Sequence, residues 1–277
     1  MQLRRALALG AAAVAAAVLI GPAPAQAAPP APPLAATTLA STIELSNCSA
    51  SLVRYPTSAA GDRAMMLTNG HCYEGGFINA GTVLRNVSST RQGTLLNADG
   101  GALGRVRADQ VLYATMTGTD VALYRLNTTF AALQTRYGAT PLTLSSGRAS
   151  AGTSMSIPSG YWKRVWTCSV DGFVPTLRED QWTWRDSIRY STGCDVIGGT
   201  SGSPIVSAVT GQVIGVNNTL NESGGRCTLN NPCEVAANGT VTVLPGRGYG
   251  QQTYWFTTCL TSSRTIDLTI SGCLLPR

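Results

Sequence analysis

Short apolar segments, repeated along most of the chain, are the feature that most restricts its fold. Runs rich in β-branched and apolar residues, such as SASLVRY, DVALYRL and QVIGVNN, are bounded by Gly, Asn, Asp or Ser. Such runs between turn-forming residues are typical of β-strands. No capped amphipathic helix interrupts the pattern, and only ALQTRYG and the region around YWFTTCLTSS could form one or two helical turns. So many short strands predict an all-β protein, built as closed barrels or as a sandwich.

The N-terminal region has a different character. Two arginines precede an apolar, Ala-rich run, and Ala25-Gln26-Ala27 then has the small-x-small pattern of a signal-peptidase site. We therefore predict a signal peptide over residues 1–27 and a secreted, extracellular protein. A membrane-spanning anchor is the weaker alternative, because the apolar run is short and two prolines follow it. We accordingly expect no membrane partner.

The next segment, residues 28–41, is rich in Pro, Ala and Thr. We predict a linker or a short pro-segment, because this composition cannot bury a core by itself. The folded region is expected to begin near Thr42. All five tryptophans lie in the second half of the chain, which indicates that two cores of different composition meet near residues 140–155.

Composition and charge exclude two classes of protein. The 277 residues are 44% hydrophobic and 12% charged, which favours a folded protein with a core over a disordered one. The net charge of +6 falls to +4 without residues 1–27, because that segment contains two arginines and no acidic residue. Lys163 is the only lysine and no run of basic residues occurs, so we expect no nucleic-acid partner. We further expect a monomer.

Eight cysteines indicate disulfide bonds, because a secreted chain folds in an oxidising compartment. A metal site is not expected, since the chain has one histidine and no C-x-x-C spacing. We predict neither a metal nor another cofactor. The cysteines are Cys48, Cys72, Cys168, Cys194, Cys227, Cys233, Cys259 and Cys273.

The stretch DVIGGTSGSP, residues 195–204, is either a plain turn or a catalytic one. A serine here becomes a nucleophile only if a base, an orienting carboxylate and N–H donors lie within reach. The only histidine, His71, is a structural residue or that base. Asp120 leads directly into an apolar strand, where a buried carboxylate needs a donor. We predict Ser201 as the nucleophile, with the N–H groups of Gly199 and Ser201 as the oxyanion hole.

The order His71, Asp120, Ser201 and the motifs around these residues resemble the chymotrypsin/trypsin family of serine peptidases in its secreted bacterial form. CSASLV and LTNGHC are similar to the family's C-x-x-S-L and L-T-A-A-H-C, TDVALYRL to D-I-A-L, and GGTSGSPI to G-D-S-G-G-P. The resemblance covers the chain from about residue 42 to its C-terminus.

This resemblance implies two antiparallel six-stranded β-barrels with the active site in the cleft between them. Residues 42–145 would form the first barrel and carry His71 and Asp120. Residues 146–277 would form the second and carry Ser201. The resemblance also implies a serine endopeptidase that hydrolyses protein or peptide substrates through an acyl-enzyme, with a proteinaceous inhibitor as an open possibility. The alternative is a catalytically silent binding module, but the sequence lacks none of the three residues.

Three positions bear on activation and specificity. Thr200 stands where the animal enzymes have an acidic residue that pairs with a new amino terminus, so that activation is not expected. GTSGSP resembles the glutamyl-endopeptidase branch, but Asn217 occupies the strand where a pocket histidine would serve acidic substrates. Asp195 lies six residues before Ser201, the offset of the pocket-floor carboxylate that binds Arg or Lys at P1 in trypsin-like members. A non-basic preference is the alternative, because Cys194 could turn Asp195 away.

The resemblance also implies one disulfide. It joins Cys48 to Cys72. Proximity in the sequence favours two further pairs, Cys227 with Cys233 and Cys259 with Cys273, and Cys168 with Cys194 then remains.

Overall fold

The structure is a computed structural model and describes residues 37–277. The predicted signal peptide, residues 1–27, and most of the predicted linker lie outside the described residues. The chain divides into units over residues 1–33 and 34–277, and the described residues belong to the second unit. Across the described part of this unit, no helix has the length and apolar character needed to cross a membrane.

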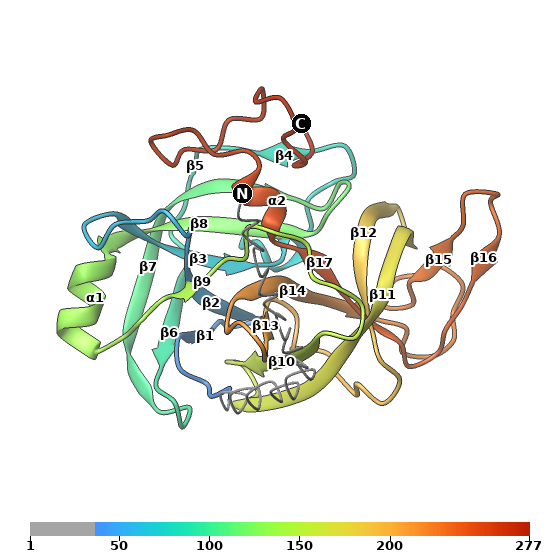
Figure 1. Cartoon of the computed structure of the whole chain (residues 1–277), viewed down its shortest axis with the longest axis horizontal. Coiled ribbons are helices and arrows are strands. Elements are labelled where there is room, and N and C mark those ends of the chain that lie inside the picture. The colour runs from blue at the N-terminus through green and yellow to red at the C-terminus, as the bar shows by residue number, and fades with distance from the viewer. Residues whose placement is uncertain (1–36) are drawn as a thin grey trace, which may run out of the picture. The chain divides into compact units, whose positions relative to one another are not determined.

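Six antiparallel strands close into the first barrel (Figure 1). The order around the ring is β1, β6, β7, β8, β3, β2, and a further pairing of β1 with β2 completes it. Short strands β4 and β5 pair with β7, and β9 runs parallel to β2. The bounds are β1 Thr42–Glu44, β2 Ser49–Arg54, β3 Arg63–Thr68, β4 Val83–Leu84, β5 Val87–Ser88, β6 Gln92–Leu96, β7 Ala102–Thr115, β8 Val121–Thr129 and β9 Leu142–Thr143.

Six strands also form the ring of the second barrel. Their order is β10, β13, β14, β17, β12, β11, and β10 pairs with β11 to close it. The β15–β16 hairpin extends this sheet from β11 and projects from the barrel (Figure 1). The bounds are β10 Ser154–Ser159, β11 Arg164–Glu179, β12 Trp182–Tyr190, β13 Pro204–Ser207, β14 Val213–Leu220, β15 Cys233–Val235, β16 Val241–Thr242 and β17 Gly248–Gln252.

The two closed rings confirm the prediction of an all-β, double-barrel fold. The helices are short: α1 spans Phe130–Tyr137, α2 spans Tyr254–Thr257, and a 3-10 turn, η1, spans Gly70–Cys72. Both α-helices lie in the two regions where the sequence allowed helical turns. Helix α1 begins because the Thr129 hydroxyl accepts the N–H of Ala132, and it ends at Gly138 in the left-handed conformation.

Two tryptophans of β12 join the second barrel to the first. The indole N–H of Trp184 donates to the carbonyl of Met116 at 2.9 Å, and that of Trp182 donates to the carbonyl of Ile78 at 2.9 Å. Both side chains are buried in a core that contains residues of both barrels. A smaller core lies within the second barrel alone. The shared core therefore sets the position of one barrel relative to the other.

The segment after β17 returns to the first barrel (Figure 1). Leu268 and Leu275 are buried in the core that includes the first barrel. The Tyr113 hydroxyl donates to the Pro276 carbonyl at 3.0 Å. The predicted second barrel, residues 146–277, includes this segment, whereas Pro276 is bonded to Tyr113 of β7 in the first barrel. The segment therefore links the two barrels.

Four disulfides are present, and they join the pairs that the sequence analysis favoured. Cys48–Cys72 ties β2 to the η1 turn, and Cys168–Cys194 ties β11 to the loop before Ser201. The other two bonds close short loops, Cys227–Cys233 and Cys259–Cys273. No free cysteine remains among the described residues.

Strand β17, GYGQQ, is fully buried although it is rich in glycine and glutamine. A Cβ atom on Gly250 would overlap the side chain of Ile205 and lie 2.9 Å from the Val216 carbonyl. Neighbouring strands therefore occupy the space that a larger residue would need, and glycine permits the close approach.

We expect Gly250→Ala to lower the free energy of unfolding by about 1–3 kcal/mol, because the added methyl overpacks the barrel. Gly147→Ala is the matched control: its Cβ would have no heavy atom within 4 Å, so the change should stay within about 0.5 kcal/mol. Equilibrium unfolding in urea, with the disulfides intact, measures both. Equal effects of the two substitutions would contradict the packing argument.

Candidate active site

His71 and Asp120 form a hydrogen-bonded pair at the end of the first barrel. His71 lies in η1, directly after β3, and Asp120 lies directly before β8. The imidazole Nδ1 is 2.7 Å from Asp120 Oδ2, and the backbone N–H of His71 donates to Oδ1 at 3.0 Å. Asp120 is fully buried, while the His71 side chain is 20% exposed. The carboxylate of Asp120 therefore fixes the imidazole ring through Nδ1, and Nε2 of His71 remains available on the side of the cavity.

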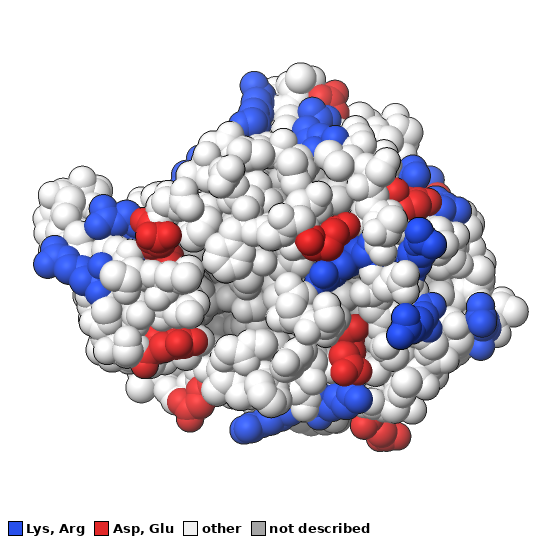
Figure 2. All heavy atoms as spheres, turned by 180° about the vertical axis from the view of Figure 1, so that it is seen from behind, with Lys and Arg blue, Asp and Glu red and all other residues white. Residues whose placement is uncertain are grey.

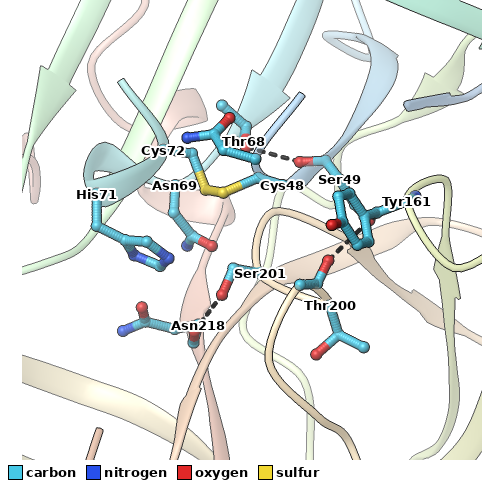
Figure 3. Close-up of a disulfide and its surroundings, with 12 residues drawn as sticks. Cys48, Ser49, Thr68, Asn69, His71, Cys72, Tyr161, Thr200, Ser201 and Asn218 are labelled. Atoms are coloured by element: carbon cyan, nitrogen blue, oxygen red, sulfur yellow. Dashed lines mark hydrogen bonds between the residues drawn. A yellow bond between two sulfur atoms is a disulfide. The ribbon is translucent and has the colours of Figure 1, made fainter. Parts of the chain in front are cut away.

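The backbone around His71 is tightly fixed. A Cβ on Gly70 would overlap the Thr115 carbonyl, so only glycine lets the turn approach β7. The disulfide Cys48–Cys72 pins the next residue to β2 (Figure 3). Ligand atoms of His71, Cys48 and Cys72 lie within 4.8 Å of one another, but the disulfide consumes both thiolates that a metal site would need.

Ser201 lies across the cavity from His71 on the second barrel (Figure 3). Its hydroxyl donates to the backbone carbonyl of Asn218 at 3.1 Å. Within residues 37–277, no hydrogen bond joins Ser201 to His71. Rotation about the Cα–Cβ bond to another staggered position would redirect the hydroxyl, and catalytic hydrogen bonds are often loose before substrate binds.

The turn before Ser201 has the backbone geometry of a type II turn. The N–H of Thr200 donates to the Ile197 carbonyl at 3.1 Å, and Gly199 has φ +86°. The N–H groups of Gly199 and Ser201, the predicted oxyanion donors, have no protein acceptor within the described part of the chain. Gly202 follows with φ +80°, and a Cβ there would overlap Ser49 of β2. The N–H groups of Gly199 and Ser201 are therefore free to bind a ligand oxygen.

A family model, the trypsin-like peptidase domain, matches residues 55–216. This match covers more than half of the 277 residues and includes His71, Asp120 and Ser201. The chain belongs to the trypsin-like peptidase family. The peptidase is accordingly a serine endopeptidase, a hydrolase of peptide bonds.

The peptidase is similar to solved structures of proteases at low sequence identity. The MamO protease domain from Magnetospirillum magneticum, in its apo form, has 14% identity and a TM-score of 0.50, covering 82% of this chain and 98% of that one. The inactive form of the Rv3671c protease has 16% identity and a TM-score of 0.46, covering 80% and 87%. The Nocardiopsis protease has 16% identity and a TM-score of 0.42, covering 76% and 89%. A comparison with curated protein sequences gave no match.

The structure does not bring Asp195 into the cavity of the peptidase. Its side chain is exposed and is not among the residues that line the cavity with His71 and Ser201. The backbone carbonyl of Asp195 accepts the indole N–H of Trp166 at 2.8 Å, and the preceding residue is bonded to Cys168. These local ties turn the carboxylate outward, and the expected pocket floor is not formed by this residue.

Asn217 does line the cavity, but both ends of its side chain bind protein groups. Its carbonyl oxygen accepts the Tyr190 hydroxyl at 2.8 Å, and its amide N–H donates to the Thr200 hydroxyl at 3.0 Å. The residue is 2% exposed. Asn217 therefore supports the turn that carries Ser201.

Glu179, at the end of β11, lines the cavity and was not anticipated from the sequence. It is 4% exposed. One carboxylate oxygen accepts the Thr219 hydroxyl at 2.6 Å, and the other accepts the N–H of Asn230 at 2.8 Å. In the sequence, Glu179 stands beside Asp180 in a polar hairpin tip, and nothing there signals burial. Only the folding of the β11–β12 hairpin over the cleft brings it to His71 and Ser201.

Burial and charge act in opposite directions on the titration of His71. Burial lowers the pKa of the imidazole, but the charge and hydrogen bond of Asp120, together with the charge of Glu179, outweigh it and raise the pKa above its ordinary value. For Glu179, burial raises the pKa of the carboxyl, although the bonds from Thr219 and Asn230 oppose that effect. The cleft thus favours a protonated imidazole.

We expect the acid limb of the kcat/KM profile to lie above pH 6.5, the ordinary histidine pKa, because His71 must be neutral to accept a proton and its pKa is raised. Glu179→Gln removes one nearby negative charge, so this limb should move to lower pH. A pH–rate profile measures the limb for both proteins. Asp99→Asn, at an exposed position away from the cavity, should leave it in place. An unmoved limb in Glu179→Gln would show that this carboxyl does not act on His71.

Proposed function

We propose that this peptidase cleaves peptide bonds with His71 as general base, Asp120 as the orienting acid and Ser201 as nucleophile. The observation that carries the proposal is the 2.7 Å bond between His71 and Asp120, in a cavity also lined by Ser201. Ser201 Oγ forms a bond to the substrate carbonyl carbon and its proton passes to His71 Nε2. The C–N bond then breaks as His71 returns that proton to the leaving amine. Water hydrolyses the acyl-enzyme by the same route.

Asp120 would set the tautomer of His71. With its Nδ1–H donated to the carboxylate, the ring carries its free lone pair on Nε2. The full burial of Asp120 strengthens its interaction with the imidazolium that forms during attack. The proposed role of Asp120 is thus electrostatic and orientational, and it needs no proton transfer to the carboxylate.

We also propose that the protein is secreted, acts on protein or peptide substrates, and works as a monomer. Four disulfides support an oxidising compartment, and the predicted signal peptide over residues 1–27 would direct the chain there. Figure 2 shows basic and acidic side chains scattered among uncharged ones on the face that it presents, without a continuous basic stripe. This distribution favours a peptide substrate over a nucleic acid.

For specificity, we propose a preference for Arg or Lys at P1, with Glu179 and Glu222 in the place that Asp195 would have taken. Both glutamates line the cavity, whereas no Lys or Arg of the described part of the chain does so. Within residues 37–277, Glu179 forms no ion pair with a basic side chain. Apolar side chains of Ile197 and Leu229 line the same cavity and suit the aliphatic stem of a basic residue.

Ser201→Ala and His71→Ala should each lower kcat/KM by roughly 10⁴-fold or more, because the nucleophile or its base is lost. Peptide hydrolysis by the purified protein measures this loss. Circular dichroism and the unfolding midpoint serve as controls for folding. If the unaltered protein were no more active than Ser201→Ala, the silent binding module would be the correct description.

Cleavage-site mapping by mass spectrometry on a diverse peptide library, with Ser201→Ala as the blank, tests the specificity. We expect cuts after Arg or Lys to dominate. Glu179→Gln combined with Glu222→Gln should reduce the preference over neutral residues by roughly 10-fold or more, because the charge that binds the basic group is gone. Asp195→Asn should leave the preference unchanged. Cuts spread evenly over neutral residues in the unaltered protein would contradict the basic preference.

A further inference from the structure

Trp162 lies outside the cavity but binds the turn that carries the nucleophile. It belongs to the tight turn between β10 and β11, and its side chain is 47% exposed. Its indole N–H donates to the backbone carbonyl of Gly198 at 2.8 Å. Gly198 itself lines the cavity with Ser201. A hydrogen bond from outside the cavity therefore acts on a peptide group at its wall.

The geometry of that peptide group fixes the direction of the next N–H. All peptide bonds of the described residues are trans, so the carbonyl of Gly198 and the N–H of Gly199 point in opposite directions. The carbonyl is directed to Trp162. The N–H of Gly199 consequently points to the other side of the turn, away from Trp162, and it meets no protein acceptor within residues 37–277.

A flip of this peptide is the main way in which the turn could lose that arrangement. The central peptide of a type II turn points in the opposite sense from that of a type I turn, with little change at the turn ends. In a type I turn Gly199 would have a negative φ instead of +86°. The flipped state would aim the Gly198 carbonyl, an acceptor, at the place where an oxyanion must be stabilised. It would also break the bond from Trp162.

We propose that Trp162 is a positioning residue, which holds the Gly198–Gly199 peptide with its N–H towards the reacting carbonyl of the substrate. This inference rests on the proposed function, since it assigns the Gly199 N–H to the oxyanion hole. Trp162 itself touches neither substrate nor reacting atoms. It lowers the population of the flipped conformation of the turn. The Gly199 N–H is then in place before negative charge develops on the substrate oxygen.

The surroundings of Trp162 hold its ring against the turn. Its backbone N–H donates to the Ser159 hydroxyl at 3.2 Å, and its ring packs edge to face on Tyr161 with centroids 5.3 Å apart. A Cβ on Gly199 would lie 2.9 Å from the indole nitrogen and 3.0 Å from the Tyr161 ring. The two aromatic rings therefore cover the outer side of the turn. The ring is held in place, and the hydrogen bond does not depend on a freely rotating side chain.

Trp162→Phe tests the inference, because it keeps an aromatic ring on the turn and removes the N–H donor. We expect kcat to fall. The lower bound is about 3- to 10-fold, which corresponds to the loss of one ordinary hydrogen bond. The upper bound is the roughly 10²- to 10³-fold loss that follows removal of an oxyanion donor. KM should change by less than about twofold, because the oxyanion forms only during reaction. Tyr161→Phe is the matched control and should retain both constants.

A pair of inhibitors separates this role from a structural one. A peptide aldehyde accepts Ser201 Oγ at its carbonyl carbon; the carbonyl electron pair moves to the oxygen, which enters the oxyanion hole, and the serine proton moves to His71. The corresponding peptide alcohol has no such carbonyl. Trp162→Phe should lower the affinity for the aldehyde by the same factor as it lowers kcat. The affinity for the alcohol should change by less than about twofold.

The outcomes are distinct. Unchanged kcat and aldehyde affinity in Trp162→Phe, with an active unaltered protein, would overturn the inference and leave the proposed function intact. An equal loss of affinity for aldehyde and alcohol would also overturn it, because that result indicates a distorted cleft. If the unaltered protein neither bound the aldehyde covalently nor cleaved peptides, the proposed function would fail, and this inference with it.

Discussion

The backbone of Ser49 joins the two barrels beside Ser201, and the geometry of the candidate active site depends on that junction. Its N–H donates to the carbonyl of Ser201 at 2.8 Å, and its hydroxyl is 2.8 Å from that of Ser159 in the second barrel. The preceding residue is Cys48, whose disulfide partner directly follows His71. The Cys48-Ser49 dipeptide, where β2 begins, thus holds the turn of His71 through a covalent bond and Ser201 through a hydrogen bond. Both groups share a single reference point, although they lie on different barrels.

The sequence predicts the strands whose apolar side chains form a regular pattern. It does not predict the segments whose structure depends on the space that other parts of the chain leave. Runs such as DVALYRL and QVIGVNN lie in strands because their apolar side chains fill the barrels. Strand β17, GYGQQ, has no such pattern. It is a strand because it pairs with β12 and β14, and its glycines leave room for Tyr190 and Ile205, so both properties depend on other parts of the chain. The return of the final segment to the first barrel likewise depends on tertiary contacts that no local pattern records.

The candidate site divides in the same way. His71, Asp120 and Ser201 stand in motifs whose residue types are dictated by chemistry, so the sequence predicts them as a candidate triad, and all three line one cavity. Asp195 was assigned from its offset alone, and a disulfide together with the Trp166 bond directs it outward. Glu179 could not be identified, because its burial arises only when a hairpin folds over the cleft. Offsets along a chain specify backbone position, whereas burial and direction of a side chain depend on the rest of the fold.

The disulfide beside His71 has a further consequence for where this enzyme can work. In a reducing compartment Cys48 and Cys72 would be separate thiols, and the turn that carries His71 would lose its covalent tie to β2. The arrangement of His71 and Ser201 is therefore coupled to the oxidation state of the chain. A copy whose cysteines are still reduced would lack this tie, so full assembly of the site would follow formation of the bond.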